Sequence, residues 1–108
     1  MKQVIAEYLT YLASERGLAG NSVAAYARDL RRAAGYLEHA GARSFQDVTR
    51  ALVARLLLWL REEGLAPRTV ARHVASLRGL FRYLLAKGYI RDDPTAHLET
   101  SSPWTRLP

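Results

Sequence analysis

Two features common in proteins are missing from this sequence: cysteine and a long apolar segment. The chain has no cysteine, which excludes a disulfide framework and a thiolate metal site. Its longest apolar run, Leu56 to Leu60, falls far short of the roughly 20 residues that cross a bilayer. Glu7 and Tyr8 interrupt the N-terminal segment, so no secretory signal is predicted. These absences favour a cytoplasmic protein without a membrane partner.

Acidic residues are missing from one long interval, between Glu63 and Asp92. The whole chain carries a formal net charge of +6 and has a pI near 10.2, and a pI above ~9 is a first indication of nucleic-acid binding. A solvated helical face is the plainer interpretation of the same pattern. The basic residues of the interval are Arg68, Arg72, Arg78, Arg82, Lys87 and Arg91.

A strand-like alternation is also absent, whereas apolar residues recur at steps of three and four along most of the chain. That spacing is typical of helices with one buried face. The 108 residues are enough for one domain. The sequence therefore predicts an all-α fold, a four-helix orthogonal bundle, with helices near residues 2–15, 21–39, 49–63 and 67–86, each boundary good to about three residues.

Residues that favour helix ends mark these boundaries. Asn21 and Thr49 are expected to cap the second and third helices, and Pro67 suits the first turn of the fourth. Gly17 fits the left-handed residue that often follows a helix. The third helix is apolar around most of its circumference, so we expect it to be the central helix of the core; the alternative is a surface for a partner protein.

The C-terminal segment is polar and punctuated by proline. Asp93 is expected to cap a short helical turn that begins with Pro94. Residues 100–108 have the composition of a linker. The sequence therefore predicts a domain over residues 1–99, followed by the start of a linker tail.

No set of residues has the spacing of a catalytic or metal site. The three histidines lie in separate elements, without the spacing of metal ligands, and His73 is expected to be packed in the core. Adjacent Glu62 and Glu63 point in different directions on a helix, and Asp92 and Asp93 fit a capping role better than acid–base chemistry. We therefore expect no catalytic residue, no metal and no cofactor.

Several segments together resemble the N-terminal core-binding domain of Xer-type tyrosine recombinases, also called the phage-integrase SAM-like domain. Each segment alone is a weak signal, but their order and spacing are specific, and they extend along the whole chain. They are YLTYL at 8–12 with RGL at 16–18, NSVAAYARDL at 21–30, GLAPRTVARHVASLRGLFRYL at 64–84, and DPTAHL at 93–98 with RLP at 106–108.

The resemblance implies a SAM-like fold and a role in chromosome dimer resolution or DNA integration. In that family this domain is half of a clamp around duplex DNA. The implied partners are double-stranded DNA, a C-terminal catalytic domain of the same protein and sister protomers in a synaptic tetramer. The family's tyrosine nucleophile lies in that C-terminal domain. We therefore expect a parent tyrosine recombinase, and no chemistry in residues 1–108.

The resemblance places the second and fourth helices toward DNA, and the residues themselves point to the same faces. Arg68 and Arg72 lie opposite the buried stripe of the fourth helix, with no acid in their own interval to neutralise them. Arg28 and Arg32 lie beside the small Ala25 on the second helix. The N–H groups at both helix N-termini can bind phosphate. The candidate DNA-binding residues are Asn21, Ser22, Ala25, Arg28, Arg32, Arg68, Thr69, Arg72, Ser76 and Gly79.

A helical protein-interaction module is the alternative function. It predicts an exposed apolar patch. DNA binding instead predicts a basic face and a steep dependence of affinity on salt.

Overall fold

A computed structural model describes residues 1–98, which form four α-helices and one short 3₁₀ helix, without a strand in that range. The predicted four-helix bundle is confirmed, and the predicted bounds agree with the observed ones to within one residue. The elements are α1 (Lys2–Ser14), α2 (Gly20–His39), η1 (Phe45–Asp47), α3 (Arg50–Glu62) and α4 (Pro67–Ala86).

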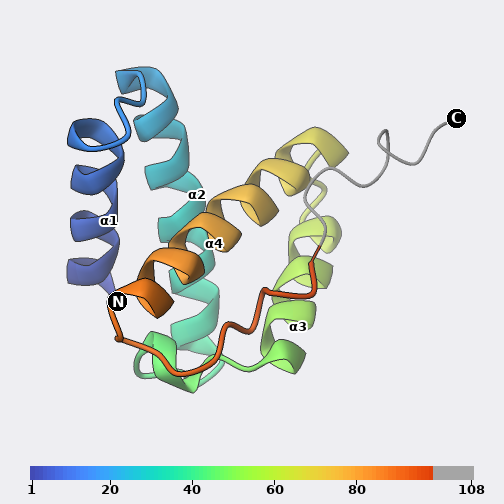
Figure 1. The fold of residues 1–108 in the computed structure, drawn as a ribbon. Helices are drawn as coiled ribbons and strands as arrows, with labels where there is room; N and C mark the ends of the chain where they lie inside the picture. The colour runs from blue at the N-terminus through green and yellow to red at the C-terminus, as the bar shows by residue number, and fades with distance from the viewer. Residues whose placement is uncertain (99–108) are drawn as a thin grey trace, which may run out of the picture.

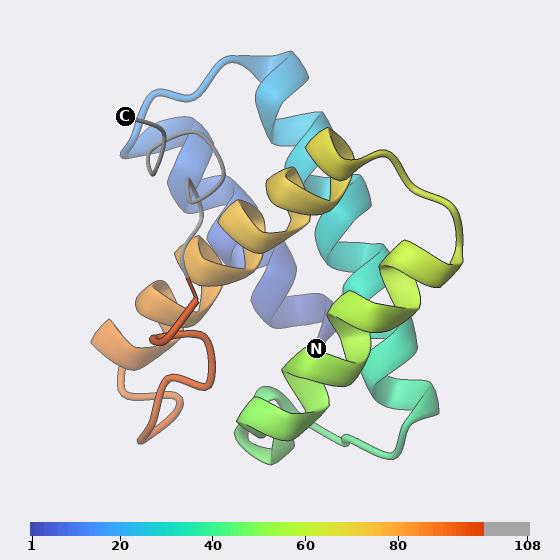
Figure 2. The same ribbon diagram turned by 90° about the vertical axis from the view of Figure 1, so that its right-hand side faces the viewer.

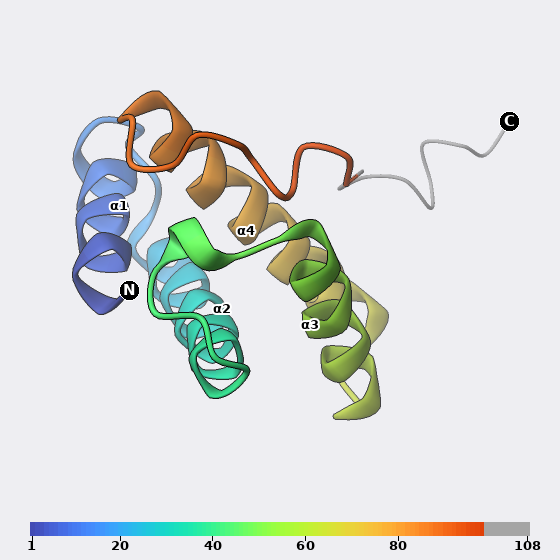
Figure 3. The same cartoon turned by 90° about the horizontal axis from the view of Figure 1, so that it is seen from below.

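The helices are arranged around α2 and α4. In Figure 1, α1 and α2 form an antiparallel pair, and α4 crosses in front of α2. Figure 2 shows α3 and α4 side by side, joined by a short connection, and Figure 3, from below, shows α4 running across the other three helices. α4 packs against α1, α2 and α3, and α2 likewise packs against the three other helices, so both are central to the bundle.

The core is formed mainly by leucines from three helices. The apolar periodicity of α2, α3 and α4 turns one stripe of each helix inward. Phe45 of η1 closes one end of the core by packing edge-to-face on Phe81, with the ring centroids 5.5 Å apart. The most deeply buried side chains of the core include Leu30, Leu37, Leu56, Leu60, Leu77, Leu80, Phe81 and Leu84.

Our expectation that the third helix would be the central one was wrong. α3 packs against α2 and α4 only, so a single face of it is buried, with Val53, Leu56 and Leu60 at its centre. Leu58 on the opposite face is 54% exposed. The burial of α3 therefore depends on its position at the edge of the bundle and not on its nearly continuous apolar sequence.

One of the two predicted helix caps is confirmed. The Thr49 Oγ1 accepts a hydrogen bond of 3.1 Å from the Leu52 N–H at the start of α3. The prediction that Asn21 caps the second helix was wrong, because α2 begins at Gly20 and its N-cap is Ala19. Neither α2 nor α4 has a side-chain cap. Gly17 has the expected left-handed conformation, with φ of +64°.

Two short turns complete the fold. The sequence did not lead us to expect η1, which a capping box between Ser44 and Asp47 stabilises. The predicted Asp93 cap is confirmed, since its Oδ1 accepts hydrogen bonds from the Thr95 N–H (2.8 Å) and hydroxyl (2.6 Å). The predicted linker at residues 100–108 lies outside the described residues. Nothing in the described helices is both long and apolar enough to span a membrane.

Candidate nucleic-acid interface

Helices α2 and α4 pack against each other, and Figure 1 shows α4 crossing in front of α2. Arg28, Arg32 and Arg68 are all exposed. Within residues 1–98, none of them forms an ion pair with a carboxylate. The structure therefore leaves these three predicted arginines exposed to solvent, on two helices that pack against each other.

The N-terminal ends of both helices lie along one edge of the predicted face. They are at the upper edge of the molecule in Figures 1 and 2. Asn21 and Ser22 are exposed in the first turn of α2, and Thr69 is half-buried in the first turn of α4. Ala25 is half-buried one turn further along α2. The backbone N–H groups of these first turns lack a side-chain cap and can bind an anion instead.

Arg72 differs from the other arginines, because it forms an ion pair. Its Nε donates to Asp29 Oδ2 at 2.7 Å and its Nη2 to Asp29 Oδ1 at 2.9 Å. The side chain of Asp29 is 2% exposed and that of Arg72 40%. The hydrogen bond with Asp29 also raises the pKa of Arg72 above its ordinary value. No acid lies near Arg72 in its own sequence interval, and the carboxylate that neutralises it comes from α2.

The ion pair fixes the orientation of the Arg72 guanidinium. A guanidinium has five N–H donors in a planar fork. The Nε–H and one Nη2 hydrogen are used on Asp29, which leaves the Nη1 side of the fork for another acceptor. Arg72 therefore remains a candidate interface residue with a fixed donor direction.

Ser76 is fully buried, although we expected it on the outer side of the fourth helix. Its hydroxyl lies 3.3 Å from Asp29 Oδ2 and 3.0 Å from the Arg72 carbonyl oxygen. The burial follows from α2, which covers this side of α4 around Asp29. Ser76 therefore supports the ion pair in this structure and is not at the solvent-facing surface.

His73 is packed in the core, as predicted. Its Nδ1 lies 2.8 Å from the Thr69 carbonyl oxygen and donates a hydrogen bond to it. Its buried Nε2 has no hydrogen-bond partner within the described residues and lies 3.5 Å from Asp29 Oδ1. His73, Ser76 and Arg72 thus surround a single buried carboxylate. The described residues contain no cluster of metal-ligating side chains.

Gly79 permits close approach of a side chain, not of another backbone. A Cβ on Gly79 would overlap the hydroxyl of Tyr8 from α1. This contact explains a glycine in the middle of a helix, where it otherwise costs up to ~1 kcal/mol relative to alanine. Gly79 therefore lies at the edge of the predicted face, next to α1.

Sequence reasoning missed a group of arginines beside Gly79. Arg16, Arg78 and Arg82 line a groove between α1, α2 and α4, together with Tyr8, Leu12, Leu18, Tyr26, Ala75 and Gly79. The helical period could have indicated Arg78 and Arg82, which lie on the outer side of α4. No local signal indicates Arg16, which follows α1 and reaches the groove only through the tertiary fold.

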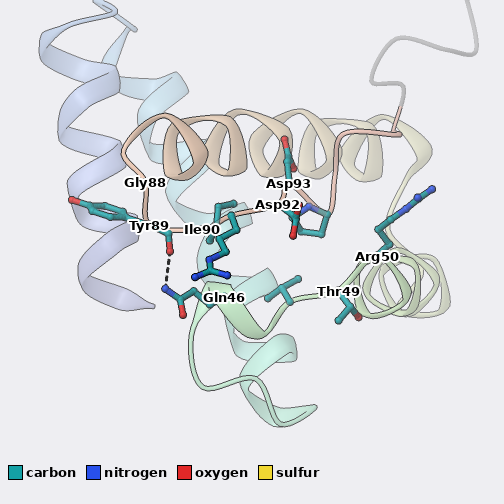
Figure 4. Close-up of a pocket in the computed structure, with 11 residues that line it drawn as sticks. Gln46, Thr49, Arg50, Gly88, Tyr89, Ile90, Asp92 and Asp93 are labelled. Carbon is teal, nitrogen blue, oxygen red and sulfur yellow. Dashed lines mark hydrogen bonds between the residues drawn. The ribbon is translucent and has the colours of Figure 1, made fainter.

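A larger cavity lies elsewhere, between the segment after α4 and the start of α3 (Figure 4). Its volume is about 610 Å³, and its lining carries both charges, with Arg50 and Arg91 beside Asp92 and Asp93. The Gln46 Nε2 donates to the Tyr89 carbonyl oxygen at 2.9 Å across one end, as the dashed line in Figure 4 marks. A lining with both positive and negative charges is more typical of a gap between two packed chain segments than of a site that binds an anion.

Exposed large apolar side chains do not form a broad patch. Among the described residues they are Leu58 on α3 and Leu85 and Tyr89 at or beyond the C-terminal end of α4. Single apolar side chains of this kind are normal on protein surfaces. The surface therefore offers less support for a protein-interaction module than for a nucleic-acid interface.

Residues 1–98 thus form a four-helix domain that exposes arginines on its second and fourth helices. The family described as "Phage integrase, N-terminal SAM-like domain" matches residues 5–88. The chain belongs to this family, and the predicted SAM-like fold is confirmed.

The relatives found for this chain are tyrosine recombinases. It is 37% identical over 109 residues to tyrosine recombinase XerD of Listeria monocytogenes serotype 4b (strain F2365), with all of this chain and 37% of that protein covered. It is 35% identical over 100 residues to tyrosine recombinase XerC of Herpetosiphon aurantiacus, with 93% of this chain and 33% of that protein covered. The chain thus spans about a third of the length of these relatives.

Proposed function

We propose that residues 1–108 are the DNA-binding, core-binding part of a site-specific tyrosine recombinase, and that the α2–α4 face binds duplex DNA. The observation that carries this proposal is the exposure of three arginines on the packed helices α2 and α4. Arg28 and Arg32 from α2 and Arg68 from α4 are exposed there, and no carboxylate within residues 1–98 pairs with them. Unpaired guanidinium groups on one surface are suited to the phosphates of a duplex.

Phosphate contacts are the main role that we assign to this face. Most hydrogen bonds between proteins and DNA go to the sugar–phosphate backbone. Asn21, Ser22 and Thr69 add helix N-termini, which attract phosphate oxygens. Arg72 is the residue best suited to contact a base, because Asp29 orients its guanidinium and a fixed fork can recognise guanine.

The remaining parts of the proposal follow from the family. The domain would form half of a clamp around the recombination site, with a C-terminal catalytic domain of the same protein as the other half. Sister protomers in a synaptic tetramer would be its protein partners. The parent protein would be a cytoplasmic recombinase for chromosome dimer resolution or DNA integration.

A binding titration against random duplex DNA at two salt concentrations tests the proposal. We expect weak binding with little sequence preference, since non-specific affinities are typically ~10⁻⁴ to 10⁻⁶ M at physiological salt. Affinity should fall steeply as salt rises. Tight binding that is insensitive to salt, or no binding at low salt, would contradict the proposal and favour a protein-interaction module.

We also propose that residues 1–108 carry no strand-cleaving chemistry, because no tyrosine in them matches the family's nucleophile. Incubating the chain with a labelled duplex and separating the products on a denaturing gel checks this. No protein–DNA adduct is expected. A covalent adduct formed by residues 1–108 would show that a nucleophile is present in this part of the protein.

A further inference from the structure

The groove between α1, α2 and α4 has a volume of about 250 Å³ and is strongly basic. Arg16, Arg78 and Arg82 line it, and none of the described residues that line it is acidic. Two acids of the neighbouring helices are engaged elsewhere. Glu7 accepts hydrogen bonds from Tyr83 and Tyr89, and Asp29 is paired with Arg72.

The wall of this groove includes the hydroxyl of Tyr8, which no described residue binds and which reaches solvent. Tyr8 is 4% exposed, yet its hydroxyl forms no hydrogen bond within the part of the chain that the structure describes. The hydroxyl lies directly over Gly79, where any side chain would displace it. Burial of the phenol raises the pKa of Tyr8 to about 12, although the charges of Arg16 and Arg82 oppose that rise. The hydroxyl therefore keeps its proton at neutral pH and can donate it.

The groove continues the stripe of α4 that carries Arg68 and Arg72. Residues 72 and 79 are seven positions apart, which is two helical turns, so they lie on the same side of α4. Ala75 lies between them and is small. An extended polyanion that lies along α4 from Arg68 to Arg72 would reach the groove next.

We propose that this groove is an oxyanion site that binds one backbone phosphate of the duplex. The Tyr8 hydroxyl donates a hydrogen bond to a phosphate oxygen, and Arg16, Arg78 and Arg82 neutralise the charge. Gly79 is required because it leaves the space in which the Tyr8 hydroxyl lies. This inference rests on the proposed DNA-binding function and adds a binding site on the α1 side of the α2–α4 face.

Tyr8→Phe is the sharpest test, because it removes the hydroxyl and keeps the ring in the core. We expect it to weaken binding of a random duplex by about fivefold to tenfold, as for a hydrogen bond to a charged group that is still partly hydrated. The salt dependence should not change, since no charge is removed. Tyr11→Phe is the matched control, because Tyr11 is on the same helix and does not line the groove.

The charged part of the site is tested separately. Arg16→Gln combined with Arg82→Gln should flatten the plot of log affinity against log salt by about one unit, because the site neutralises one phosphate. Gly79→Ala should weaken binding at least as much as Tyr8→Phe, because it moves the same hydroxyl. Thermal unfolding of each variant identifies any weakening that is due to misfolding, and Tyr8→Phe then remains the decisive variant.

Inorganic phosphate has the same oxyanion groups as a backbone phosphate of DNA, so it is the other candidate ligand for the groove. Amide NMR spectra of the chain, titrated with inorganic phosphate or with a short duplex at equal ionic strength, separate the two sources. We expect the Gly79 amide to shift with the duplex and the Tyr8→Phe variant to lose that shift. A shift with inorganic phosphate alone would overturn the proposal.

The result of these tests also separates this proposal from the function on which it rests. If the groove variants bind like the parent while an Arg28, Arg32 and Arg68 variant loses affinity, the groove proposal is wrong and the DNA-binding proposal stands. If the parent binds no duplex at all, both are wrong.

Discussion

At the scale of single residues, the carboxylate of Asp29 joins the two helices of the candidate interface. It lies between α2 and α4 and accepts hydrogen bonds from Arg72 and Ser76. A buried carboxylate without its partner is costly, because the charge has been removed from water without compensation. Arg72 therefore has a structural role in addition to any contact with DNA.

Replacing Arg72 by alanine should destabilise the domain. We expect a loss of about 3 kcal/mol, at the lower end of the range for breaking a buried ion pair, because Arg72 is partly exposed. Arg55→Ala is the control, since Arg55 is exposed on α3, and should change stability by no more than about 0.5 kcal/mol. Urea unfolding measures both. Equal stability of the two variants would mean that the Asp29 carboxylate does not depend on Arg72.

Glu7 provides a test by pH at the same scale. The hydrogen bonds from Tyr83 (2.5 Å) and Tyr89 lower the pKa of Glu7 below 4.5, and the first also raises the pKa of Tyr83 to about 12. A carboxyl group whose pKa is lowered in the folded state stabilises the fold above its unfolded pKa and loses that effect as pH falls.

We therefore expect the melting temperature of the parent to fall more than that of Glu7→Gln when the pH is lowered from about 5 to about 3. Glu15→Gln is a matched control, because Glu15 is exposed at the end of the same helix and is not a hydrogen-bond partner of either tyrosine. Identical acid profiles of the parent and Glu7→Gln would contradict the role of this cluster.

At the scale of whole elements, the helices differ in whether a side chain caps their N-terminus. The start of α3 is capped by Thr49, whereas α2 and α4 begin without a side-chain cap. α1 also begins without a side-chain cap, and among the three uncapped helices α2 and α4 are those whose N-termini lie at the candidate interface. Their free N–H groups are consistent with an anion as the missing partner.

Thr49→Ala should destabilise the domain by about 1 kcal/mol, the usual cost of removing a cap. Asn21→Ala should have an effect within about 0.5 kcal/mol, since Asn21 is exposed in the first turn of α2 and does not cap it. Thermal unfolding of the two variants provides the comparison. A larger effect for Asn21→Ala would restore Asn21 as the cap of α2.

The helices could be predicted from the sequence, because their apolar spacing and terminal residues are local signals. Contacts between distant residues could not. Asp29 and Arg72 are 43 residues apart, and no periodicity within one helix indicates that they pair. Arg16 reaches the basic groove only after α1 and α4 pack together. The edge position of α3 likewise depends on the arrangement of all four helices, so its apolar sequence was misleading.

At the scale of the whole molecule, charge is distributed unevenly over the surface. The proposal assigns exposed arginines of α2 and α4 to the DNA-binding face, whereas Arg43, Arg50 and Arg55 are exposed in and around α3. An arginine of either group contributes the same charge to the net value of +6. If net charge alone attracted DNA, removing either group would have the same effect on DNA affinity. If the α2–α4 face binds DNA, the two groups would differ in that effect.

The central claim is tested most directly by measuring how duplex affinity depends on salt in two triple variants with the same change in charge. Arg28→Gln, Arg32→Gln and Arg68→Gln together should reduce the slope of log affinity against log salt by about 0.9 for each phosphate that the variant no longer neutralises. Arg43→Gln, Arg50→Gln and Arg55→Gln together should leave that slope close to the parent value. Equal slopes for the two triple variants would contradict the assignment of the α2–α4 face to DNA.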